Sequence, residues 1–222
     1  MQRLTDIPVD IDHQEVRRRL RLDSSEEIQR LIDTGHPLIK ANAVFEACYI
    51  EARLDDGIQL KGIPLHSRLL KRNFEKAERV FPYVVTIGRE LEEAAASCKD
   101  LVRQYYLDVL GNLAVTAARE YLESHIKRRF GLGKLSRMSP GSLKEWPIEE
   151  QRKLFSILGD VEASIGVSLS KSCLMVPRKS VSGIFFPTEI PFLSCQLCPR
   201  EQCPGRQASY DEKLAADFEI GE

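Results

Sequence analysis

The sequence lacks the features typical of membrane, secreted and nucleic-acid-binding proteins. No stretch approaches the roughly 18 consecutive apolar residues that a membrane helix needs, and the first residues contain no apolar run of the kind found in secretion signals. The 32 basic and 33 acidic residues nearly cancel to a formal net charge of -1, so no overall field would attract nucleic acid or an anionic membrane. We therefore expect a cytoplasmic protein that has neither nucleic acid nor a membrane as a partner.

The composition is that of an ordinary globular protein. Hydrophobic residues make up 43% of the 222 residues and charged residues 29%, with no internal repeat and no low-complexity linker. We expect a core at 81–190 and an N-terminal part at 1–80 that belongs to the same domain. A cysteine-containing tail follows at 191–222, and we expect the part after Pro204 to be loosely held.

Capping and turn patterns dominate the first 80 residues. Asp12 and Ser24 are each followed three residues later by a glutamate, as at many helix starts. Asp55-Asp56-Gly57 is typical of a hairpin turn. The patterns together predict a short strand at 7–11, two short helices of which the second ends at Gly35, a hairpin formed by 44–54 and 58–60, and a helix over 67–80.

The second part of the chain alternates long helical patterns with short β-branched runs. The spacing predicts a helix over 89–129 broken near 98–100, a helix over 147–158, and strands at 83–87, 167–169, 173–176 and 181–186. Strands and helices follow no regular βαβ rhythm. This arrangement favours an α+β, or mixed α/β, fold with a largely antiparallel twisted sheet and flanking helices.

One segment has the composition of a ligand loop: Arg137-Met138-Ser139-Pro140-Gly141-Ser142. An arginine can hold a carboxylate with two parallel hydrogen bonds, and a Pro-Gly turn brings backbone groups close to a flat ligand. Pro-Gly turns between elements are also common without any ligand, so the residues alone leave both interpretations open.

This segment resembles the Arg-x-x-Pro-Gly-Tyr loop by which the activation domains of cobalamin-dependent methionine synthases bind S-adenosylmethionine. A second block, comprising 165–177 and 180–186, is similar to the paired strands of that family, with their Ile-Gly-x-x-Leu-Thr-x-Ser start and Ser-Val-Ser-Gly end. Val85-Thr86-Ile87-Gly88 also fits the pattern. The blocks occur in the family's order over 83–186, so the chain resembles a short, stand-alone member.

The resemblance implies a role in reactivating a corrinoid cofactor. The family domain presents S-adenosylmethionine to cobalamin that has stalled after losing an electron, and a one-electron donor such as a ferredoxin or flavodoxin completes the reductive methylation. This chain would serve a separate corrinoid-binding protein or methyltransferase subunit, which would present the cobalamin. Its own contribution would be positioning, as an accessory to the methyltransferase system.

The resemblance also assigns residues to the ligand. Arg137 would bind the carboxylate of S-adenosylmethionine, and Ser139 and Gly141 would contact the ligand through backbone groups. Ser142 takes the place of the family's tyrosine, which is a departure from the pattern. Trp146 could replace the lost aromatic surface, or it could pack against the start of the following helix.

A second departure lies on the long predicted helix. A family carboxylate that holds the ligand's amino group corresponds to Thr116, and Glu120, one turn later, is the nearest acidic substitute, unless it is simply a solvated charge. These departures support an alternative function, in which the fold persists as a non-catalytic docking module for a corrinoid protein.

Three cysteines lie close together in the tail, in the pattern Cys195-x2-Cys198-x4-Cys203. Thiolates at this spacing can reach one metal ion, and Zn or an iron-sulfur cluster would take a fourth ligand such as Cys173 or a histidine. Reduced free thiols are the alternative interpretation. The sequence thus predicts a candidate metal site, and the docking-module alternative includes this Zn or iron-sulfur site in the C-terminal tail.

Overall fold

A computed structural model of the chain describes residues 1–189, 192–203 and 206–217. At its centre is a six-stranded sheet with the strand order β1-β2-β7-β11-β8, in which β3 also pairs with β7. The strands are β1 (Gln2–Leu4), β2 (Asn42–Phe45), β3 (Cys48–Tyr49), β7 (Arg79–Thr86), β8 (Leu135–Met138) and β11 (Ser180–Pro187). Every pairing in this sheet is antiparallel, which confirms the predicted α+β class.

Two smaller sheets complete the strands. One contains β4 (Ala52–Leu54), β5 (Gly57–Leu60) and β6 (Ile63–His66), and the other pairs β9 (Ser168–Leu169) with β10 (Met175–Val176). The predicted hairpin is confirmed where β4 meets β5 across Asp55-Asp56. Its first arm, however, is not one strand from 44 to 54, because β2 and β3 pair with β7 while β4 leaves for the smaller sheet.

The helices begin largely where side-chain caps predict. They are α1 (His13–Leu20), α2 (Ser25–Gly35), α3 (Arg68–Asn73), α4 (Glu90–Ser97), α5 (Leu101–Phe130), α6 (Gln151–Leu158), α7 (Val161–Ile165) and α8 (Glu212–Asp217), with 3-10 turns η1 (His36–Leu38), η2 (Ile148–Glu150) and η3 (Ser194–Leu197). Asp12 and Ser24 accept hydrogen bonds from backbone N–H groups of the first turns of α1 and α2. Asp100 caps α5 in the same way, which explains the predicted break after α4.

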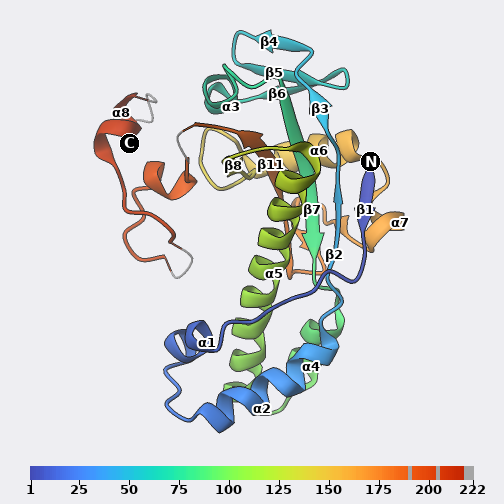
Figure 1. The fold of residues 1–222 in the computed structure, drawn as a ribbon, viewed down its shortest axis with the longest axis vertical. Coiled ribbons are helices and arrows are strands. Elements are labelled where there is room, and N and C mark those ends of the chain that lie inside the picture. The colour runs from blue at the N-terminus through green and yellow to red at the C-terminus, as the bar shows by residue number, and fades with distance from the viewer. Residues whose placement is uncertain (190–191, 204–205, 218–222) are drawn as a thin grey trace.

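The two faces of the sheet contact different helices. Side chains alternate along a strand, so Phe81, Tyr83 and Val85 of β7 share a core with α1, α2 and α5, whereas Val84 packs with Leu158 of α6 on the other face. Figure 1 shows α5 running along the long axis of the molecule across the sheet, with α1, α2 and α4 at one end and the small β4-β5-β6 sheet at the other. The buried face of α5 therefore fixes where its remaining side chains point.

Some predicted elements differ from the structure. Residues 7–11 are extended and their apolar side chains are buried, but they form no strand, and Ile7 donates one backbone hydrogen bond to Ala41 at 2.9 Å. The helix expected over 67–80 is only α3, because the chain becomes extended at Arg79 to enter the central strand β7. None of the described helices combines the length and the apolarity needed to cross a bilayer.

The C-terminal segment, defined here as the described residues 192–203 and 206–217, is packed against the rest of the protein. Ala215 is 1% exposed within a core that includes Trp146 and Phe186. The backbone N–H of Phe192 donates to the hydroxyl of Ser136 in β8 at 2.6 Å. The tail after Pro204 thus contacts the core through Ala215 and Leu214 of α8, while most other side chains of 206–216 are exposed. That this tail is loosely held stays a prediction.

Candidate functional site

Arg137 lies on strand β8, and not on a loop as the Pro-Gly pattern suggested. Its backbone pairs with Phe185 of β11, and the strand ends one residue later at Met138. Its neighbours Ser136 and Met138 are buried, so the alternation of the strand directs Arg137 to the opposite side. There one guanidinium nitrogen donates to the side-chain oxygen of Gln207, and another lies 3.9 Å from a carboxylate oxygen of Glu123 on α5.

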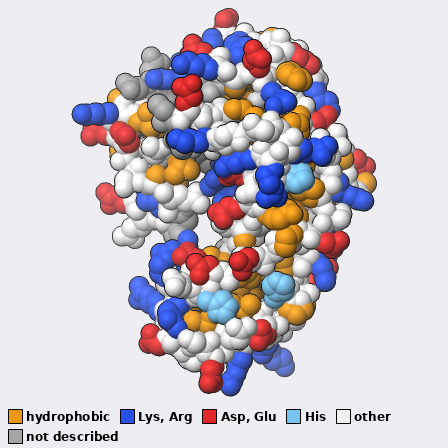
Figure 2. All heavy atoms as spheres, in the orientation of Figure 1, with side chains coloured by type: hydrophobic (Ala, Val, Ile, Leu, Met, Phe, Trp, Pro, Cys, Tyr) orange, Lys and Arg blue, Asp and Glu red, His pale blue; other side chains and the backbone are white. Residues whose placement is uncertain are grey.

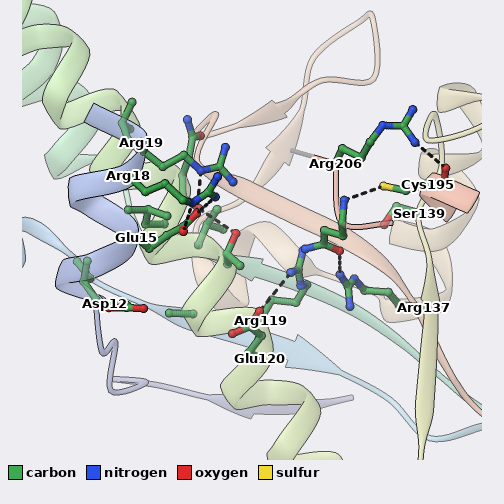
Figure 3. A pocket seen from close by; sticks show the side chains of 18 of the residues that line it. Asp12, Glu15, Arg18, Arg19, Arg119, Glu120, Arg137, Ser139, Cys195 and Arg206 are labelled. Carbon is green, nitrogen blue, oxygen red and sulfur yellow. Dashed lines mark hydrogen bonds and ion pairs between the residues drawn. The ribbon is translucent and has the colours of Figure 1, made fainter. Parts of the chain in front are cut away.

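A cleft of about 1040 Å³ opens beside Arg137. Figure 2 shows the surface deeply hollowed between the C-terminal segment and α1. Four parts of the chain contribute side chains to the cleft: Asp12, Glu15, Arg18 and Arg19 from α1 and its cap; Tyr105, Thr116, Arg119 and Glu120 from α5; Arg137, Ser139 and Ser142 from β8 and the turn after it; and Cys195, Arg206 and Gln207 from the C-terminal segment. The cleft is thus lined by both signs of charge (Figure 3).

Most residues assigned through the resemblance meet in this cleft. Those that line it are Arg137, Ser139, Ser142, Glu120 and Thr116. Gly141 is not among the residues that line the cleft. It adopts a φ of +77° and donates its N–H to the carbonyl of Trp146 at 2.7 Å, and an added Cβ would lie 2.9 Å from Ile148. Its position therefore supports a role in shaping the turn.

Trp146 does not supply the aromatic surface that Ser142 lacks. It is fully buried in the core that also contains Phe186 and Ala215, here called the second core, and its indole N–H has no hydrogen-bond partner among the described residues. It lies two residues before η2 and shares its core with Leu154 and Ile157 of α6, in agreement with packing against the start of the helix. The aromatic side chain that lines the cleft is Tyr105 of α5, which is half-exposed.

Two partly buried residues that line the cleft, Arg119 and Ser139, interact with the buried Tyr83. Tyr83 is 1% exposed, stacks on Phe185 with ring centroids 4.2 Å apart, and has its hydroxyl hydrogen-bonded to Ser139. Burial raises the pKa of Tyr83, so the phenol stays neutral. Burial lowers the pKa of Arg119, and the positive charge of Arg137 acts in the same direction.

Gly183 leaves the space in which the hydroxyl groups of Ser139 and Tyr83 lie. An added Cβ there would lie 2.4 Å from the carbonyl oxygen of Met138, 2.8 Å from the hydroxyl of Ser139 and 3.0 Å from that of Tyr83. The glycine of the Ser-Val-Ser-Gly block therefore has a physical role: it lets the end of β8 and the turn that follows lie close against β11, so that Ser139 reaches Tyr83 of β7.

On the rim of the cleft formed by α1, acidic and basic side chains form a hydrogen-bonded cluster. Glu15 accepts hydrogen bonds from Arg18 at 2.6 and 2.8 Å and from Arg19 at 2.8 Å. The bonds from these two arginines lower the pKa of Glu15 to about 2. Together with Glu120 opposite, this rim offers carboxylates as well as guanidinium groups to a ligand, which suits a molecule that carries both charges.

The three clustered cysteines lie in different surroundings. Cys195 lines the cleft and accepts a hydrogen bond from the N–H of Gln207 at 3.4 Å, Cys198 packs against the second core, and Cys203 is exposed. Within residues 1–189, 192–203 and 206–217, no three Cys, His, Asp or Glu side chains gather in a way that could hold a metal ion. The metal site thus stays a prediction from spacing alone.

Arg206 organises the loop that carries these cysteines. Its guanidinium donates to the carbonyl oxygens of Cys195 at 3.2 Å, Cys198 at 3.0 Å and Ala208 at 2.9 Å, and also to that of Arg200. One side chain thus holds several backbone carbonyls of the loop together through multiple hydrogen bonds.

Sequence reasoning missed Arg119, Gln207 and the residues of α1 that line the cleft. For Arg119 a signal was present, because it stands between Ala118 and Leu122, both buried, and a charge beside the apolar face of a helix usually has a specific role. For Gln207 and α1 no local pattern exists, since their place in the cleft follows from the tertiary arrangement.

No protein-family model matches the sequence, and no significant match was found among curated proteins. Among solved structures, the chain is similar to the crystal structure of the MetH reactivation domain bound to AdoHcy, with a TM-score of 0.65 and 17% sequence identity. The match covers 87% of this chain and 80% of that chain. The chain therefore has the fold of the MetH reactivation domain, which confirms the fold expected from the resemblance.

Proposed function

We propose that this protein binds S-adenosylmethionine in the cleft between α1, α5, β8 and the C-terminal segment, and supports reductive methylation of a corrinoid cofactor held by a separate protein. The observation that carries the proposal is the likeness, over 87% of the chain, to a reactivation domain bound to AdoHcy. AdoHcy is S-adenosylmethionine without its methyl group, so a site built for one accommodates most of the other.

The chemistry of the cleft fits such a ligand. Its volume of about 1040 Å³ lies at the upper end of the range usual for small-molecule sites. S-adenosylmethionine carries a carboxylate, an ammonium group, a sulfonium and an aromatic base. Arg137 can meet the carboxylate, Glu120 the ammonium and Tyr105 an apolar or aromatic part, while Ser139 and Ser142 offer polar groups at the turn.

The proposed partners are a corrinoid-binding protein or methyltransferase subunit and a one-electron donor of the ferredoxin or flavodoxin type. S-adenosylmethionine would supply the methyl group, and the partner would supply the cobalamin that accepts it. This chain's residues would hold the ligand at the open cleft, where a docked partner could reach it.

One observation favours a second candidate, the non-catalytic docking module. Two nitrogens of Arg137 already face Gln207 and Glu123, and the family's carboxylate position is Thr116, whose hydroxyl donates to the Asn112 carbonyl at 2.9 Å. In this interpretation Arg137 is engaged by the protein's own side chains, and the fold serves to bind a corrinoid protein.

Calorimetric titration of the anaerobically purified protein with S-adenosylmethionine separates the two candidates. Under the first, binding is saturable and Arg137→Ala weakens it by about 2 kcal/mol, the typical contribution of a charged hydrogen-bonded contact. Arg128→Ala, an exposed arginine of α5 that does not line the cleft, is the matched control and should bind like the wild type. Absence of saturable binding would contradict the first candidate and leave the docking module.

A further inference from the structure

Arg119 lines the cleft but has buried polar atoms without hydrogen-bond partners among the described residues. Its side chain is 13% exposed, yet its Nε and Nη2 atoms are buried and have no hydrogen-bond partner among the described residues. The nearest carboxylate oxygen, on Glu120, lies 3.9 Å from Nη2, which is too long for a hydrogen bond. A guanidinium in this condition has lost water without gaining a replacement, a state that costs stability.

The two unpartnered atoms belong to one edge of the guanidinium. Nε–H and one N–H of Nη2 point in parallel, and this edge makes two parallel hydrogen bonds to a carboxylate. Because neither nitrogen has a hydrogen bond to give up, the side chain can turn its edge toward the cleft that it already lines without losing a contact of that kind.

The position of Arg119 relative to Arg137 suggests that both arginines could contact the same anionic group. Figure 3 shows the two side chains approaching each other across the inner wall of the cleft, one from α5 and one from β8. Their mutual repulsion contributes to the lowered pKa of Arg119. Among the described residues, the carboxylates near these two guanidinium groups are Glu120 and Glu123, each 3.9 Å away and therefore too far to hydrogen-bond to them, so an anionic group that reached both arginines would gain electrostatically.

We infer that Arg119 is a second carboxylate-binding residue of the cleft, and that it grips the ligand's carboxylate together with Arg137. The inference deepens the proposed function, on which it rests for the identity of the ligand. Two nitrogens of Arg137 already face Gln207 and Glu123, so fewer of its N–H groups are available to a carboxylate. Arg119 has both Nε and Nη2 available for the two parallel hydrogen bonds. Arg119 thus determines that the ligand must carry a carboxylate.

The test pairs a change in the protein with a change in the ligand. The wild type, Arg119→Met and the control Arg128→Met are each titrated with S-adenosylmethionine and with decarboxylated S-adenosylmethionine, which lacks only the carboxylate. Arg119→Met should weaken binding of S-adenosylmethionine by about 10-fold to 100-fold and leave binding of the decarboxylated ligand within about twofold. Arg128→Met should change neither. Arg119→Lys, which keeps the charge without the paired edge, should lie between wild type and Arg119→Met.

Two results would overturn the inference: unchanged affinity of Arg119→Met for S-adenosylmethionine, or an equal loss for both ligands. Thermal melting of each variant shows that it is folded. If the wild type binds neither ligand, the proposed function is refuted. Whether Arg119 binds a carboxylate is then tested by measuring the melting temperature with L-methionine and with its methyl ester, each at millimolar concentration. A larger upward shift for L-methionine in the wild type, absent in Arg119→Met, upholds the subsite; equal shifts refute it.

Discussion

Gly183→Ala tests whether the close approach of β8 to β11 shapes the cleft. The added methyl carbon would stand 2.4 Å from the carbonyl oxygen of Met138 and 2.8 Å from the hydroxyl of Ser139. Met138 is the last residue of β8 and is paired with Ile184, so its carbonyl cannot retreat without disturbing the pairing of β8 with β11. A normal contact requires a shift of about 1 Å or more.

The expected loss of stability follows from two opposed effects. Forcing an extra carbon into a packed region costs about 1–3 kcal/mol, and replacing glycine by alanine regains about 0.4–1 kcal/mol through the unfolded chain. Because the nearest atom is backbone in a paired strand, we expect the loss near the top of its range and a net destabilisation of about 2 kcal/mol. For a chain of this length that lowers the melting temperature by about 4–8 °C.

Urea denaturation followed by circular dichroism measures this effect. Gly133→Ala is the matched control, because nothing lies within 4 Å of its added Cβ and its φ is not positive, so it should be neutral or slightly stabilising. Gly183→Ala should also bind S-adenosylmethionine more weakly than the control, since Arg137 and Ser139 move with β8. Equal stabilities of the two variants would refute the reasoning.

Three further predictions concern the rim and the tail. Hydrogen bonds from Arg18 and Arg19 lower the pKa of Glu15 to about 2, so the stability that Glu15 contributes is present above its ordinary pKa and is lost as the pH falls toward 2. The unfolding free energy of Glu15→Gln should therefore fall less between pH 5 and pH 2 than that of the wild type. An equal fall in both proteins would contradict the assignment. Arg206→Ala removes the side chain that binds the carbonyls of the cysteine loop, so limited proteolysis should cut that loop faster than in Arg200→Ala, with equal rates counting against it. If Cys195, Cys198 and Cys203 bind Zn or an iron-sulfur cluster, anaerobically purified protein should contain metal that is lost in Cys198→Ser; metal-free wild-type protein would leave the free-thiol interpretation.

Local sequence was a good guide where a cap or turn determines the outcome. Asp12, Ser24 and Asp100 each place a side-chain acceptor at the start of a helix, a choice that depends only on neighbouring residues. The helix expected over 67–80 was too long because the pattern there competes with β7, whose residues gain more from the centre of the sheet. Such competition is not visible in a short window.

The site was predicted only in part, because a sequence pattern connects residues that are neighbours along the chain and not those that the fold brings together. Arg137, Ser139 and Ser142 are adjacent in sequence, and a motif can name them together. Arg119, Gln207 and the α1 residues reach the cleft only because α5, the C-terminal segment and α1 are brought there by separate contacts. Trp146 shows the converse, since a residue near the motif in sequence lies wholly inside the second core.

The partners of Arg137 bear on how strongly the cleft can hold an anion. A carboxylate that reaches Arg137 must replace the side-chain oxygen of Gln207 as the acceptor of one hydrogen bond, so the net gain is reduced by the bond that is lost. Arg119 differs, because its buried Nε and Nη2 have no acceptor among the described residues and any bond they form is a gain. The affinity of the cleft for a carboxylate should therefore depend at least as much on Arg119 as on the arginine of the Pro-Gly motif.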